Sequence, residues 1–144
     1  DSSGAGELLA ELNVLCEQGN IQLLRFLGTL YRTTNAGALG AHGVIPAIAN
    51  VVPKASSMGW EAGERGDRDM VRECNAKLVV ATRIAQLAKG GGPNAASLSG
   101  LKSALKLMGI LENDFVSRPL RNITEQEKLG LPDILMELGL DSKH

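Results

Sequence analysis

Apolar residues at the start of the chain recur at the spacing of a helix. The spacings from Leu8 to Leu12 and from Leu12 to Leu15 are four and three positions. Leu9 and Cys16 are the immediate neighbours of Leu8 and Leu15 and widen the apolar stripe. The pair Gly19-Asn20 is typical of a helix end. A short apolar run over 21–27 then stops at Gly28, a pattern that predicts a strand followed by a tight turn.

The next two segments continue this alternation. Residues 29–39 are expected to be helical, although Thr33, Thr34, Asn35 and Gly37 give the segment a poor helix propensity. The run from Gly43 to Ile48 follows a glycine-rich turn and predicts a second buried strand. Helix, strand, helix and strand with short connections indicate an α/β protein with parallel strands.

From Pro53 onward the pattern predicts helices alone. We expect helices over 52–64 and 67–88, a break over 89–94, and a further amphipathic helix marked by Leu98, Leu101, Leu105 and Met108. Thr124 with Glu127 forms a capping box for the last helix, and Pro132 should kink or restart it. The apolar stripe of the 67–88 helix consists of Met70, Cys74, Leu78, Ala81, Ile84 and Ala88.

Two short parallel strands do not make a stable sheet by themselves. Both faces of a parallel sheet need cover, and its unpaired edges need partners. The sequence therefore predicts that further strands come either from another chain or from a longer polypeptide.

Composition excludes several kinds of partner. The 144 residues carry a net charge of −1, and aromatic residues make up 3%, which disfavours nucleic acid and anionic membranes. No apolar run approaches the roughly 20 residues that span a bilayer. Cys16 and Cys74 both fall on predicted apolar stripes, so we expect buried thiols and take a reducing, cytoplasmic location as the default.

The residues contain no complete catalytic constellation. His42 and His144 are the only histidines, too few for a metal site or a Ser-His-Asp triad, and no metal is expected. The glycines at 90–92 lack the Gly-Lys-Ser/Thr ending of a phosphate-binding loop. Gly28, Gly40 and Gly43 lie where strands meet turns, so they allow either close packing or the approach of a ligand to the backbone.

Several motifs together resemble a known family. They are Asp1-Ser2-Ser3-Gly4, Gly28 fifteen positions before Gly43, Gly43-Val44-Ile45 leading to Ala49-Asn50, Pro93-Asn94, the run from Gly100 to Leu105, and Arg118-Pro119-Leu120. In order and spacing they resemble the second half of the dihydrodipicolinate synthase / N-acetylneuraminate lyase family of Schiff-base aldolases.

The resemblance implies a fold and an assembly. Family members are (βα)8 barrels with added C-terminal helices, usually tetramers. Residues 1–54 would hold the loop after strand six through strand eight, the last two strands of the barrel. Residues 55–144 would hold helix eight and the helical extension. The partner would be the N-terminal half of the same barrel.

The resemblance also implies where the chemistry lies. The family's imine-forming lysine is expected immediately before Asp1, and its proton-shuttling tyrosine lies further upstream, so no catalytic residue is expected in this chain. Gly28 and Ile45 match positions that line the substrate pocket, and no cofactor is implied. Ser2 and Ser3 would shape the loop beside the lysine. Lys102 matches a recurring family lysine, although a solvated or structural charge is the favoured reading.

The expected function is a pyruvate-dependent lyase that cleaves a 2-keto-3-deoxy or 4-hydroxy-2-oxo acid to pyruvate and an aldehyde. Sialic acid is disfavoured because Thr29, Leu30 and Ala47 stand where sialic acid lyases carry an acidic pair and a serine. Dihydrodipicolinate synthase, which condenses pyruvate with aspartate semialdehyde, is the alternative. A non-catalytic helical interaction module is a second alternative, against which the exposed strands argue.

Overall fold

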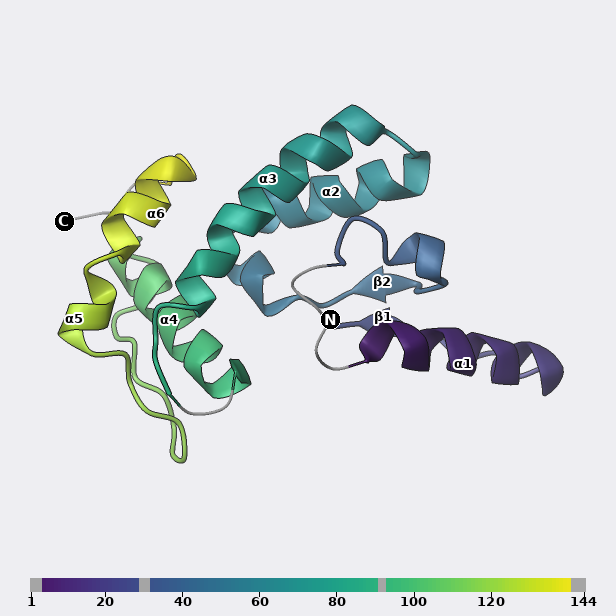
Figure 1. The fold of residues 1–144 in the computed structure, drawn as a ribbon, viewed down its shortest axis with the longest axis horizontal. Coiled ribbons are helices and arrows are strands. Elements are labelled where there is room, and N and C mark those ends of the chain that lie inside the picture. The colour runs from purple at the N-terminus through teal and green to yellow at the C-terminus, as the bar shows by residue number, and fades with distance from the viewer. Residues whose placement is uncertain (1–3, 29–31, 91–92, 141–144) are drawn as a thin grey trace. The chain divides into compact units, whose positions relative to one another are not determined.

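The computed structural model describes residues 4–28, 32–90 and 93–140 (Figure 1). The chain forms two compact units. The first comprises 1–49 and 53–78, and the second comprises 50–52 and 79–144. The predicted division after residue 54 concerns the complete barrel and stays a prediction.

The first unit contains a small parallel sheet with helices against it. Helix α1 covers Ala5–Gln18, and strands β1 (Phe26–Leu27) and β2 (Gly43–Val44) pair in parallel. Helix α2 covers Pro53–Arg65, and the unit also holds the first part of α3 (Arg68–Ala85). Two short 3-10 helices lie at Gly37–Leu39 (η1) and Ala47–Asn50 (η2). The parallel pairing is the one predicted.

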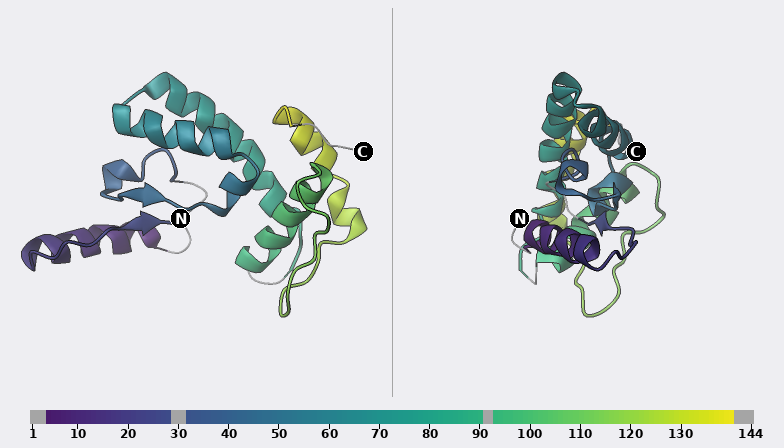
Figure 2. Two further views of the ribbon diagram at one scale, coloured as in Figure 1. Left: turned by 180° about the vertical axis from the view of Figure 1, so that it is seen from behind. Right: turned by 90° about the vertical axis from the view of Figure 1, so that its right-hand side faces the viewer.

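The core of this unit lies between the sheet and its helices. It consists of Leu9, Leu27, Ala36 and Ala41, with Ala5, Leu39, Val44 and Trp60 packed against them. Leu27 and Val44 are opposite each other in the strand register, and both pack in this core, so this pair faces the helices. Helices α2 and α3 lie side by side in both views of the molecule (Figure 2), with Gly59 close to Cys74.

A loop sits closely against α2 because α2 has glycines there. A Cβ on Gly63 would lie 1.9 Å from the carbonyl oxygen of Thr34, so only glycine fits without a backbone shift. Thr34 Oγ1 also bonds Asn75 Oδ1 at 3.0 Å. These contacts fix the connection between β1 and β2 against the helices.

The strands are much shorter than predicted. Only residues 26–27 of the predicted 21–27 strand pair with a neighbour, and 21–25 form no regular structure. The predicted strand over 43–48 ends at Val44 and passes into η2. Pro46 has no N–H to donate to a ladder, which explains why β2 is short. Within the described residues β1 pairs with β2 alone, which explains why so little of 21–27 is a strand.

The predicted 29–39 helix is also wrong over its described part. Residues 33–36 are turns and 37–39 are η1, while 29–31 lie outside the described residues. The β-branched residues Thr33 and Thr34 and the turn-favouring Asn35 prevail over the helical prediction. In α1 the helix is confirmed, but Leu9 and Cys16 are buried whereas Leu8, Leu12 and Leu15 are exposed.

The second unit consists of helices, as predicted. It contains the end of α3, α4 (Pro93–Leu107), α5 (Glu125–Lys128) and α6 (Leu131–Glu137). The capping box of Thr124 and Glu127 is present, and Pro132 stands in the first turn of α6, so the helix restarts there. The core includes Ile84, Ala104, Leu131, Ile134 and Leu135, all at most 2% exposed.

Two further predictions concern the whole described chain. Cys16 and Cys74 are free and buried, as expected from their stripes. Within 4–28, 32–90 and 93–140, none of the helices has the length and apolar character needed to cross a bilayer.

Candidate functional site

The carboxyl ends of β1 and β2 bring Gly28 and Ile45 together. The strands are parallel, so both end at the same edge of the sheet (Figure 1). Ile45 donates its backbone N–H to the carbonyl oxygen of Leu27 at 3.0 Å. A Cβ on Gly28 would lie 3.8 Å from the carbonyl oxygen of Ile45. The two predicted pocket residues are therefore neighbours, although they lie 17 positions apart in sequence.

Of the described residues, Gly28 and Ile45 meet at the carboxyl ends of the strands, and neither carries a reactive side chain. Gly28 is exposed, and Ile45 is 70% exposed. Among the described residues no three His, Cys, Asp or Glu side chains gather into a possible metal site. Neither Gly28 nor Ile45 carries a nucleophilic side chain, so covalent chemistry at this place would need a nucleophile from elsewhere.

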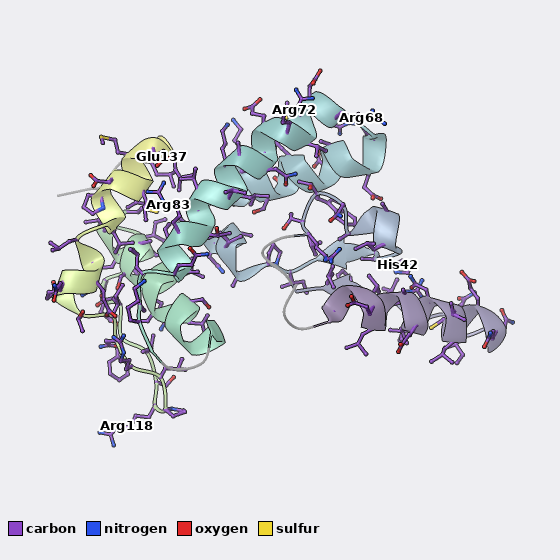
Figure 3. The ribbon with its side chains drawn as sticks, in the orientation of Figure 1. His42, Arg68, Arg72, Arg83, Arg118 and Glu137 are labelled. Carbon is purple, nitrogen blue, oxygen red and sulfur yellow. The ribbon has the colours of Figure 1, made fainter. Side chains whose placement is uncertain are left out.

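His42 lies at the opposite, amino-terminal end of the strands (Figure 3). The imidazole Nδ1 of His42 accepts a hydrogen bond from the backbone N–H of Arg25 at 3.2 Å. The backbone N–H of His42 donates to the Arg25 carbonyl oxygen at 2.7 Å. These bonds tie the start of β1 to the start of β2.

A groove lies beside the unpaired edge of β2. It encloses about 360 Å³ between β2 and the first half of α2. Its walls are mostly apolar, with two serines on the helix side. The lining residues are Phe26, Gly43, Val44, Pro46, Ala49, Pro53, Ser56, Ser57 and Trp60. Sequence reasoning did not single out Phe26, because the 21–27 run gave no sign of which face each residue takes.

The charged residues of the second unit are largely paired with one another. Arg121 bonds Glu127 at 2.7 Å and also the Lys89 carbonyl, and the hydrogen bond from Arg121 holds the pKa of Glu127 well below its usual value. Arg83 and Glu137, labelled in Figure 3, join α3 to α6 at 2.5 Å. Lys102 Nζ donates to the Phe115 carbonyl at 2.7 Å, which supports the structural reading of this lysine.

The fold defines the class of protein. The chain resembles a solved dihydrodipicolinate synthase from Bacteroides thetaiotaomicron with a TM-score of 0.72 and 25% identity, over 83% of this chain and 39% of that one. This likeness places it among α/β proteins of the TIM-barrel type. The model of the dihydrodipicolinate synthetase family matches residues 4–138, and the chain belongs to that family.

Curated relatives agree with this assignment. The 4-hydroxy-tetrahydrodipicolinate synthases of Methanococcus vannielii and Methanocaldococcus jannaschii are each 28% identical over 138 residues. The alignment covers 96% of this chain and 42% of each relative, so the chain spans about two fifths of their length. The named relatives are synthases, and the family is one of enzymes.

Proposed function

We propose that this chain is the C-terminal part of a pyruvate-dependent Schiff-base aldolase. In this proposal β1 and β2 are the last two strands of a (βα)8 barrel. The observation that carries it is the meeting of Gly28 and Ile45 at the carboxyl ends of two parallel strands. In (βα)8 enzymes the active site lies at that face of the barrel.

The proposed chemistry needs an amine, which a lysine directly before Asp1 would supply. The amine attacks the ketone of the 2-oxo acid and water leaves, giving an imine that stabilises a carbanion at the neighbouring carbon. Gly28 leaves room for the bound acid because it has no side chain. Ile45 presents an apolar surface, and a less polar surrounding favours the neutral, nucleophilic form of the amine.

The proposed partner is the N-terminal half of the same barrel. The unpaired edge of β2 and the adjacent groove offer backbone groups and apolar walls to a further parallel strand. The exposed leucines of α1, Leu8, Leu12 and Leu15, offer a second apolar face. A complete barrel would cover both surfaces, which supports the proposal over a self-standing helical module.

The proposed reaction is aldol cleavage of a 2-keto-3-deoxy or 4-hydroxy-2-oxo acid to pyruvate and an aldehyde. Ala47 follows β2 within η2 and provides no hydroxyl for a sugar acid, which argues against sialic acid. The second candidate is condensation of pyruvate with aspartate semialdehyde. The names of the curated relatives favour it, since each is a 4-hydroxy-tetrahydrodipicolinate synthase.

An assay of both reactions separates the two candidates. The complete barrel is incubated with 4-hydroxy-2-oxo and 2-keto-3-deoxy acids, and released pyruvate is measured. In parallel, pyruvate and aspartate semialdehyde are supplied, and consumption of the semialdehyde is followed. Cleavage without condensation is expected. Condensation alone would replace the first candidate by the second. The absence of both activities would contradict the proposed function.

A further inference from the structure

The face of the sheet opposite the helices holds Phe26. Leu27 and Val44 belong to the core that faces the helices, and successive strand residues point to opposite faces. Phe26 and Gly43, the pair before them in the register, therefore face the other way. Phe26 is 55% exposed, whereas Leu27 is 4% exposed, which agrees with this assignment.

The ring of Phe26 lies across Gly43 on the neighbouring strand. A Cβ on Gly43 would lie 2.7 Å from Cε1 and 2.9 Å from Cδ1 of Phe26, so the ring occupies the space that a side chain would take. The ring also borders the groove at the far edge of β2. The Phe26 side chain therefore covers both residues of the Phe26–Gly43 pair on this face of the sheet.

The same alternation puts Phe26 beneath the candidate site. Gly28 comes two residues after Phe26, and Ile45 comes two residues after Gly43, so all four share one face. A rise of about 3.3 Å per residue sets the Phe26–Gly43 level roughly 7 Å below that of Gly28 and Ile45. A molecule bound between Gly28 and Ile45 would meet the ring if it extended in that direction.

We propose that the Phe26 ring is the floor of the substrate site and limits how far a bound 2-oxo acid extends toward the amino-terminal ends of the strands. This inference rests on the proposed function, since it concerns the same site. Phe26 would act as a specificity-determining residue and would take no part in bond making. The ring would exclude a substituent of the 2-oxo acid that points down the strands, whereas the chain that is cleaved would leave toward their carboxyl ends.

The test compares imine formation with pyruvate and with 2-oxobutyrate, which is one methylene longer. The complete barrel is treated with borohydride in the presence of each acid, and the rate of covalent adduct formation is measured by intact mass. Phe26→Ala should raise the ratio of the 2-oxobutyrate rate to the pyruvate rate about tenfold, the lower end of what one methylene contributes to selectivity. Phe26→Leu should give a smaller increase.

Two further variants separate a floor from general loosening. Leu24→Ala removes an exposed apolar side chain from the same segment, further from Gly28, and should leave the ratio unchanged. Gly43→Ala should displace the ring and slow trapping of both acids, whereas adding Phe26→Ala to it should remove that loss. Thermal unfolding of each variant shows that the compared proteins are folded.

The outcomes are distinguishable. Adduct formation with an unchanged ratio in Phe26→Ala would overturn the floor and leave the proposed function intact. An equal rise in the ratio for Leu24→Ala would also overturn it, because the effect would then not depend on the ring. Absence of any adduct in the unsubstituted barrel would overturn both the proposed function and this inference.

Discussion

The carboxylate of Asp114 is held by side chains from two helices of the second unit. It accepts hydrogen bonds from Lys128 Nζ at 2.8 Å and Ser103 Oγ at 2.7 Å, and Lys106 Nζ lies 3.4 Å away. The hydrogen bond from Lys128, followed by that from Ser103, holds the pKa of the Asp114 carboxyl well below its usual value of 3.8. Asp114 joins the loop before α5 to both α4 and α5.

Asp114→Asn should lower the free energy of unfolding by about 2 kcal/mol at pH 7, the size of a hydrogen-bond loss at a charged group. The folded-state pKa is depressed, so this stabilisation is complete above the unfolded-state pKa and is lost as pH falls through the folded value. The difference from wild type should therefore shrink below about pH 4. Urea denaturation across pH measures it, with exposed Glu112→Gln as control. A pH-independent difference would refute the charge-based explanation.

The substitution Gly28→Ala tests the proposed site by adding a single methyl group. Its φ lies outside the left-handed region, and the nearest atom to an added Cβ is 3.8 Å away, so Gly28→Ala should fold normally. The methyl group would occupy the space proposed for the 2-oxo acid. We expect pyruvate trapping to slow about tenfold or more, with an unchanged thermal midpoint. Trapping at the wild-type rate would remove Gly28 from the proposed site.

At the scale of elements, helices were predictable where the pattern is local. The α3 stripe of Cys74, Leu78, Ala81 and Ile84 is buried as its spacing predicts. The capping box at Thr124 depends on two residues three positions apart, so the sequence contains the whole motif. The strands were overpredicted, because the length of a strand depends on neighbours that an apolar run does not specify.

The contact between α3 and α4 depends on Gly100. A Cβ there would lie 2.3 Å from the carbonyl oxygen of Ile84, so the backbones must separate to admit one. Gly100→Ala should destabilise the protein by about 1–3 kcal/mol, the usual cost of overpacking. Gly6→Ala in α1 is the matched control, since its Cβ would meet only the Arg32 side chain at 3.4 Å. Equal stabilities by chemical denaturation would show that α4 shifts without cost.

At the scale of the molecule, the sheet is the part that the sequence could only partly predict. Parallel pairing followed from the order of elements, and the need for further strands followed from the exposed edges and faces. The meeting of Gly28 and Ile45 came from the family resemblance, and the register of β1 and β2 supports it. The Phe26–Gly43 contact depends on which residue opposes which, and no spacing in the sequence specifies that register.

The central claim is that these two strands complete the site of an imine-forming enzyme. The most direct test is borohydride reduction of the native protein with pyruvate, followed by intact mass and peptide mapping. The account predicts one pyruvyl adduct, on the lysine immediately before Asp1. A folded protein that gains no adduct, or gains it on a lysine elsewhere, would contradict it.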